Sequence, residues 1–246
     1  MAHEALPPSA QGRADVPAPG ERAPDPREAQ FLATEHWSLL ATRSLSWSEA
    51  FSRTGMFLST LSAATVALAL VGPATSFGDE FAVFALVILS ITLFLGIATF
   101  ARLTQVNNED LYWVAGMNRL RGAYVRLVPG IEHEFFAGWT VDPRGISRTF
   151  AAVDVSTPSP LHMLVTTPAV VGIISAAIAG VIAGLAAIQV AAGMGPAIGL
   201  GLFVFVVGIG LFVGFSIREG RRFIGRIDAL VADQGAVRQP EGRRLD

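Results

Sequence analysis

Three long stretches of the sequence contain no charged side chain, and they limit what the chain can fold into. They cover residues 54–78, residues 81–101 and, with His162 counted as neutral, residues 155–217. About 20 helical residues, each rising about 1.5 Å, cross the roughly 30 Å of hydrocarbon in a bilayer. The first two stretches are long enough for one crossing each, and the third is long enough for two. The sequence therefore predicts an all-α integral membrane bundle of four transmembrane helices with a small helical cytoplasmic region.

Glycine and proline residues mark where these crossings begin and end. Gly72-Pro73 closes the first crossing, and Thr167-Pro168 opens the third, because proline suits a first helical turn. A turn over residues 191–196, rich in glycine and proline, separates the third crossing from the fourth. We therefore expect the crossings at residues 55–72, 81–101, 167–190 and 197–217.

The positive charges predict how the chain is oriented. All 18 are arginine, and they lie before residue 54, between residues 102 and 148, or after residue 217. Because positively charged loops are retained in the cytoplasm, both termini and the central segment are expected there, in a protein of the bacterial plasma (inner) membrane. The net charge of -2 gives no basic excess for a nucleic acid. The expected partners are therefore the lipid bilayer and a second copy or another membrane protein.

The same pattern divides the chain into six segments. The Ala/Pro-rich start has no apolar core and is typical of a disordered tail. The expected segments are this tail at 1–24, cytoplasmic or interfacial helices at 25–53, transmembrane helices 1 and 2 at 54–101, a cytoplasmic helical segment at 102–165, transmembrane helices 3 and 4 at 166–217, and a cytoplasmic C-terminal helix and tail at 218–246.

Two capping patterns predict helix starts before the first crossing. Residues 25–28 (DPRE) combine a capping aspartate, a proline and a glutamate, and residues 46–49 (SWSE) form a capping box. Trp37 and Trp47 suit a helix lying at the level of the lipid headgroups. Packing of these tryptophans against the cytosolic region is the equal alternative.

The central segment predicts further helix and turn structure. An apolar stripe continues the second crossing to residue 127, where Pro129-Gly130 ends the helix, and Asn118 lies off this stripe. Residues 107–110 (NNED) could cap a helix or bind a cation, and capping is favoured. Residues 142–145 (DPRG) are interpreted as a turn, followed by irregular chain as far as Pro160.

Small residues predict how the membrane helices pack, because lipid tails compete with large apolar side chains for contact. The third helix carries one at every fourth position, and the fourth carries a matching pair. Hydroxyl and small side chains on the first two helices could also meet across helices. A homo-oligomer face or a pore lining is the alternative to packing within one chain. The residues are Gly172, Ala176, Gly180 and Gly184 on the third helix, Gly210 and Gly214 on the fourth, Ser59, Ser62, Thr65 and Ala69 on the first, and Ala85, Thr92, Gly96 and Thr99 on the second.

Recognisable reaction chemistry is missing from the sequence. Residues 132–134 (EHE) offer ligand-type side chains, but helical neighbours point about 100° apart and cannot converge on one metal. Residues 145–147 (GIS) lack the second glycine of a nucleophile elbow. His162 marks the membrane interface before the third helix. Neither an enzyme, a cofactor nor a metal site is expected, and the four apolar cores hold no ionisable group of the kind that marks a transport path.

Three strings resemble uncharacterised four-helix membrane proteins of high-GC bacteria. They are residues 35–40 (EHWSLL), residues 53–57 (RTGMF) and residues 116–121 (GMNRLR), within a likeness over residues 30–230. The resemblance implies a membrane location and no assigned chemistry. The chain is also loosely similar to two-helix membrane effectors of bacterial nucleotide-signalling systems, which have half as many crossings. We expect a non-enzymatic accessory or interaction protein, with an oligomeric channel or pore-forming effector, gated by its cytoplasmic helices, as the alternative.

Overall fold

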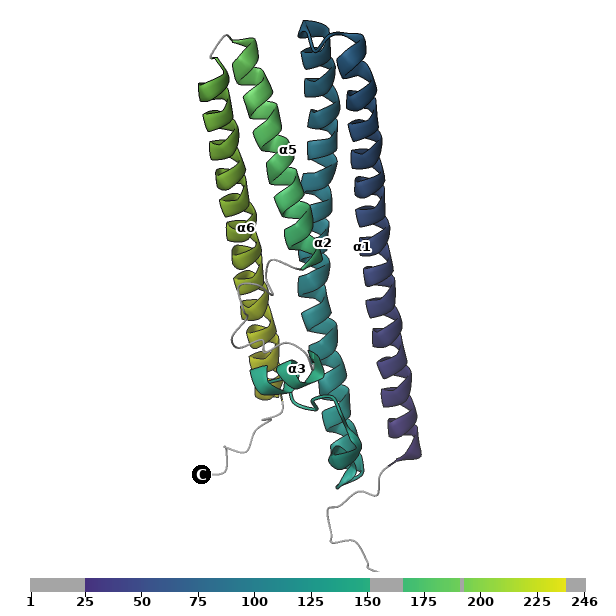
Figure 1. Ribbon diagram of the computed structural model, residues 1–246. Coiled ribbons are helices and arrows are strands. Elements are labelled where there is room, and N and C mark those ends of the chain that lie inside the picture. Colours follow the sequence, from purple (N-terminus) through teal and green to yellow (C-terminus); the bar gives the residue numbers. More distant parts are fainter. Residues whose placement is uncertain (1–24, 151–165, 191–192, 238–246) are drawn as a thin grey trace, which may run out of the picture.

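The computed structural model describes residues 25–150, 166–190 and 193–237, and it confirms the all-α fold (Figure 1). Of the helices described, four are long and apolar enough to cross a membrane. The elements in chain order are α1 (Pro26–Ala74), α2 (Asp79–Leu127), the 3-10 helix η1 (Ile131–Glu134), α3 (Pro143–Phe150), α5 (Thr167–Gln189) and α6 (Met194–Val237). The predicted tail at 1–24, the interface position of His162 and the end of the chain from 238 lie outside the described residues.

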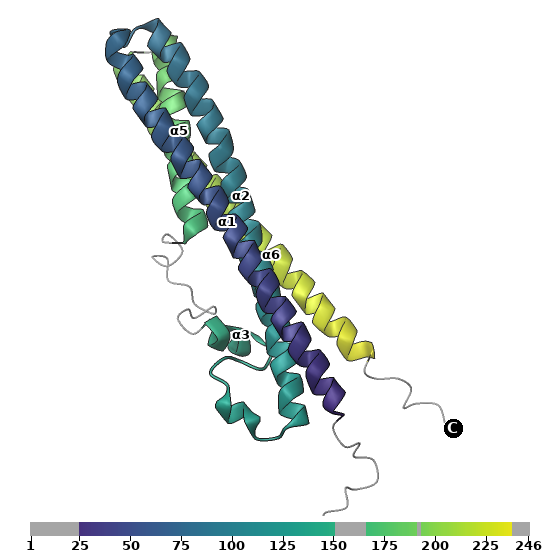
Figure 2. The ribbon, with the colours of Figure 1, turned by 90° about the vertical axis from the view of Figure 1, so that its right-hand side faces the viewer.

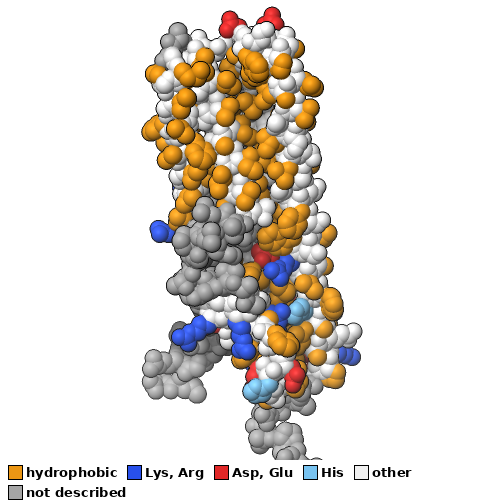
Figure 3. All heavy atoms as spheres, viewed as in Figure 1, with side chains coloured by type: hydrophobic (Ala, Val, Ile, Leu, Met, Phe, Trp, Pro, Cys, Tyr) orange, Lys and Arg blue, Asp and Glu red, His pale blue; other side chains and the backbone are white. Residues whose placement is uncertain are grey.

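The long helices form a row in which each packs on its neighbour in the order α1, α2, α5, α6 (Figures 1 and 2). α1 and α2 are antiparallel, and the start of α1 lies at the same end of the molecule as the end of α2 (Figure 1). Apolar side chains cover the upper half of the face in Figure 3, while the arginine and histidine side chains lie in the lower half. The apolar and arginine-bearing halves are therefore separated along the helix axes.

α1 is a single helix from Pro26 to Ala74, so the second start predicted at residues 46–49 is wrong. The first start is confirmed, because the Asp25 carboxylate accepts a hydrogen bond from the Arg27 N–H at 2.9 Å. A capping box acts only where the residues before it leave the helix. Here helical residues precede Ser46, and arginine side chains bind Glu49 instead. α1 therefore enters the apolar region without a bend into the headgroup plane.

α2 extends past the second apolar stretch to Leu127, as the sequence predicts. Residues 107–110 lie inside this helix, so their interpretation as a cap is wrong. Residues 142–145, predicted as a turn, begin α3. The Asp142 carboxylate accepts from the Gly145 N–H at 3.2 Å, which is how aspartate before proline starts a helix. α6 begins at Met194 after Gly193 in a left-handed conformation (φ 77), so the predicted turn at 191–196 is shorter than expected.

At the centre of the bundle, α1, α2 and α5 pack against one another. A Cβ atom added to Gly96 of α2 would collide with the hydroxyl of Ser175 and lie 2.9 Å from the ring of Phe57. Phe57 is 1% exposed, so this close approach fixes which side of α1 faces α2. The small residues predicted on the second helix are accordingly buried: Ala85, Thr92, Gly96 and Thr99.

The set predicted on the first helix faces outward instead: Ser59, Ser62, Thr65 and Ala69. Successive helical residues rotate by about 100°, and the seating of Phe57 turns these positions away from α2. The hydroxyls of Ser62 and Thr65 donate to carbonyl oxygens of their own helix, Leu58 at 2.9 Å and Leu61 at 2.8 Å. Among the described residues their expected bonds across helices are not made, so the interpretation of this set as internal packing is wrong.

Candidate functional site

The close contact between α5 and α6 is built from glycine. A Cβ atom on Gly180 would lie 2.7 Å from the carbonyl oxygen of Gly201, and one on Gly208 would lie 3.1 Å from the Cβ of Ala176. Gly172 packs against the rings of Phe100 and Phe212, and Gly184 lies against Ala197. The third-helix residues named by the sequence thus all contact a neighbouring helix.

The structure places the other two residues of the predicted packing set elsewhere. Gly210 and Gly214 are exposed, and a Cβ atom on either would meet nothing within 4 Å. The α6 glycines that contact α5 are Gly201 and Gly208. The pairing of Gly210 and Gly214 with the third helix is therefore wrong within one chain, because the α5 contact fixes the rotation of α6.

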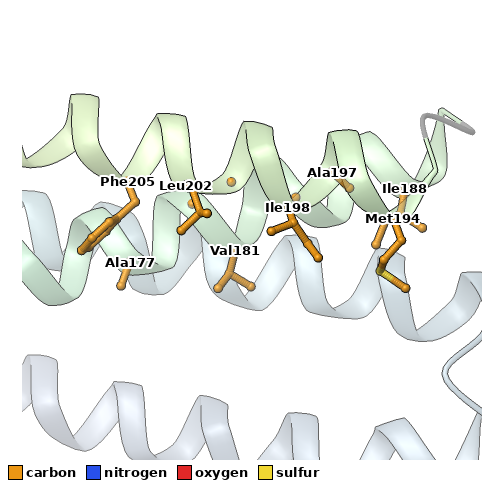
Figure 4. A pocket seen from close by; sticks show the side chains of 11 residues that line it. Ala177, Val181, Ile188, Met194, Ala197, Ile198, Leu202 and Phe205 are labelled. Atoms are coloured by element: carbon orange, nitrogen blue, oxygen red, sulfur yellow. The ribbon is translucent and has the colours of Figure 1, made fainter.

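A groove of about 420 Å³ lies beside this contact, between α5 and α6 (Figure 4). Its floor is formed by small residues, and its walls include Val181, Ile198 and Phe205. The lining side chains are all aliphatic, aromatic or thioether and offer no polar group. The groove can hold hydrocarbon, and it has no group that could take part in a reaction.

The first polar cluster lies where α1 and α2 continue beyond their apolar stretches. Asp110, which is 3% exposed, accepts three hydrogen bonds. Its donors are the Arg43 Nε at 2.5 Å, the Arg43 NH2 at 3.0 Å and the Trp47 Nε1 at 2.9 Å. Hydrogen bonding to Asp110 raises the pKa of Arg43. A buried carboxylate requires such partners, so the cluster fixes the register of α1 on α2.

A second ion-pair group lies nearer the apolar region. Arg102 contacts Glu49 of α1 at 2.9 Å and Glu109 of its own helix at 3.2 Å, and Arg53 contacts Glu49 at 2.8 Å. Hydrogen bonds from Arg102 and then Arg53 lower the pKa of Glu49. Since these side chains are partly exposed, solvent screens the pairs and each contributes little to stability. These pairs hold Arg102, the first arginine after the second apolar stretch, against α1.

Asn118 holds the segment after α2 onto the helix. It is fully buried, although the sequence placed it off the apolar stripe. Its amide nitrogen donates to the Thr140 carbonyl at 3.0 Å, and its oxygen accepts from Arg121 at 2.9 Å and Thr149 at 2.7 Å. Asn118 therefore satisfies polar groups from α2, from α3 and from the connection before α3.

Arg121 and two rings complete the polar end of the α1–α2 pair. The rings of His36 and Tyr124 stack with their centroids 6.2 Å apart. Burial, and then the positive charge of Arg121, lower the pKa of His36. Burial, and then the positive charge of Arg43, lower the pKa of Arg121 itself. Two arginines of different helices thus lie close enough to repel each other.

The remaining sequence candidates have structural roles. Residues 132–134 form η1, in which Glu132 accepts a hydrogen bond from the Gly130 N–H at 2.9 Å. Among the described residues, histidine and acidic side chains do not gather into a group that could hold a metal ion. Sequence reasoning missed the Arg43–Asp110–Trp47 cluster. Its one signal was that Asp110 falls in helical phase with Val106 and Val114, which are buried.

Comparisons with protein-family models, with curated proteins and with solved structures found no match to this chain.

Proposed function

We propose that the chain is a non-enzymatic, multi-pass protein of the bacterial inner membrane that works by associating with a second copy of itself. Both termini and the α2–α3 region face the cytoplasm in this proposal. The segregation of arginine supports the orientation. The lack of recognisable reaction chemistry in the sequence supports a role in interaction.

The observation that carries the proposal is an exposed apolar face of α1 outside the apolar region. Phe31, Trp37 and Leu45 are 74%, 71% and 72% exposed. At about 1.5 Å per residue, Leu45 lies about 13 Å and Trp37 about 25 Å before the start of the apolar stretch at residue 54. Lipid does not cover side chains that far from the hydrocarbon, and exposed apolar patches mark interaction surfaces.

The middle of this face suits an identical helix. Between Trp37 and Leu45 around the helix lie Thr34, Ala41 and Ser48, which are small, uncharged and exposed. Small residues allow close approach of two helices, and flanking apolar side chains then pack on each other. A second copy of α1 offers the same arrangement, so the surface is self-complementary.

Cysteine cross-linking in membranes tests this association cleanly, because the sequence contains no cysteine. Ala41→Cys and Ser48→Cys should give a disulfide-linked dimer on oxidation. The matched control is Gln105→Cys, an exposed residue of α2 outside its apolar stretch, which should remain monomeric. Equal dimer yields from all three variants, or no dimer from either α1 variant, would refute the proposal. If α1 forms cross-links only to a different protein, the proposed partner is that other membrane protein and not a second copy of this chain.

A channel is the second candidate, and the outward-facing hydroxyls favour it. Ser59 and Ser62 face away from the chain's own core, so a ring of copies joined through α1 could line a pore with them. Sustained ion flux through liposomes containing the purified protein would support the channel over the accessory role. Flux no greater than that of empty liposomes would exclude it.

Reporter fusions test the orientation. Fusions at Arg53, Gly138 and Asp246 should report the cytoplasm, and a fusion at Gly78 should report the outside, because Gly78 lies between α1 and α2. An external signal from the fusion at Asp246 would overturn the even number of crossings.

A further inference from the structure

Arg121 is a half-buried cation that has no acidic partner among the described residues. Its NH1 donates to two neutral oxygens, that of Asn118 at 2.9 Å and the Gly138 carbonyl at 3.5 Å. Its Nε and NH2 donate to no described residue, and neither atom is fully buried. One edge of the guanidinium therefore has free donors that reach the surface. Such an edge matches two oxygens of a phosphate or carboxylate group.

The charges around this edge favour an anion. Asp110 neutralises Arg43 through the Nε and NH2 bonds, which leaves the NH1 of Arg43 unbonded among the described residues. The positive charge of Arg43 acts on Arg121, and that of Arg121 acts on His36. With His36 neutral, the group of Arg43, Arg121 and Asp110 carries one net positive charge. A bound anion would supply the countercharge that the described residues lack.

The position of Arg121 decides between a lipid headgroup and a soluble ligand. Arg121 lies 20 residues beyond Ala101, the last residue of the second uncharged stretch. That corresponds to about 30 Å along the α2 helix. The headgroup layer adds only about 5–8 Å to each side of the hydrocarbon. A lipid phosphate in the same membrane therefore does not reach this site.

We propose that Arg121, with Arg43 and His36 beside it, forms a binding site for the phosphate group of a small soluble molecule. Free donors on two arginines suit phosphate, which offers more acceptor oxygens than a carboxylate. The His36 ring stacks on Tyr124, which lies three residues after Arg121 on α2. This site is independent of the α1 face used in the proposed association, so either proposal can fail without the other.

Chemical modification of the wild-type protein tests the site without any mutation. Phenylglyoxal reacts with accessible guanidinium groups, and peptide mass spectrometry reports the extent at each arginine. In nanodiscs of zwitterionic lipid, inorganic phosphate should slow modification of Arg121 several-fold, whereas chloride at equal ionic strength should not. Arg119, an exposed residue of the same helix, is the internal control and should react at the same rate throughout.

The outcomes separate the alternatives. Equal protection of Arg119 and Arg121, or protection of neither, overturns the site. Equal protection of Arg121 by acetate overturns the assignment to phosphate. Protection by anionic lipid in the nanodisc, with none by inorganic phosphate, overturns the soluble source. A variant provides the second measurement: Arg121→Gln should lose the phosphate-dependent rise in Tm, and Arg119→Gln should keep it. An unchanged rise in Arg121→Gln contradicts the proposal.

Discussion

Replacing Trp47 with phenylalanine tests whether the buried carboxylate of Asp110 joins α1 to α2. The indole N–H donates to Asp110 at 2.9 Å, and phenylalanine removes that donor while keeping an aromatic ring. The Asp110 side chain is 4% exposed, so water does not readily replace the bond. A hydrogen bond to a charged group contributes about 1.5–3 kcal/mol. Trp47→Phe should therefore lower the free energy of unfolding by about that amount.

Trp113 supplies the matched control, because it lies on α2 and its buried indole nitrogen has no hydrogen-bond partner among the described residues. Removing an unpaired buried donor relieves a cost of about 1–3 kcal/mol. Trp113→Phe should therefore leave the free energy of unfolding unchanged or raise it, although both substitutions remove similar volume.

The assay is denaturant unfolding in mixed micelles, read by the circular dichroism of the helices. Each variant is also placed in an Asp110→Ala background, where no carboxylate remains to accept the bond. In that background Trp47→Phe should lower the free energy of unfolding by no more than Trp113→Phe does. Equal losses from Trp47→Phe and Trp113→Phe in the wild-type background would refute the reasoning, because the loss would then come from ring size.

Three further predictions concern helix packing, pH and salt. Gly201→Ala should destabilise the chain by about 1–3 kcal/mol, because its Cβ would lie 2.9 Å from the Gly180 carbonyl oxygen; Gly210→Ala, in open space, should be neutral or stabilising in the same thermal assay. His36 has a lowered pKa in the fold, so its contribution to stability is complete above its unfolded pKa of about 6.5 and is lost as the pH falls through the folded value. The Tm of the wild type should therefore fall more steeply between about pH 7.5 and 5.5 than that of His36→Gln, and parallel curves would contradict this. Glu49→Gln should lower the Tm only slightly, because solvent screens its pairs with Arg102 and Arg53, and the loss should shrink when unfolding is repeated in about 1 M salt.

The sequence predicts those structural features that depend only on neighbouring residues in the chain. Uncharged stretches of membrane-spanning length are set by composition alone, and the end of α2 by Pro129-Gly130. The stripe from Gly172 to Gly184 needed only helical spacing to be recognised.

Features that depend on the rotation of one helix against another could not be predicted. Arg43 and Asp110 are separated by 67 residues, and no local sequence pattern around either residue indicates that they pair. The outward turn of Ser59 follows from the seating of Phe57 on Gly96. The open position of Gly210 likewise follows from the contact between Gly180 and Gly201. In each case the spacing of residues along the sequence predicts which side chains share a face of a helix. Only the packing of the helices determines which face contacts a neighbour.

Because α2 is one unbroken helix, its part beyond the apolar stretch moves rigidly with the part inside it. Residues 102–127 extend past the apolar stretch within one helix, a rigid arm of about 39 Å at about 1.5 Å per residue. A tilt of only about 5° in the bilayer would swing the far end of that arm sideways by about 3 Å. Because Asn118 fastens the connection before α3 to the arm, that segment would travel with it. A small change in the tilt of α2 within the lipid is thereby magnified into a larger displacement of the segment that Asn118 holds.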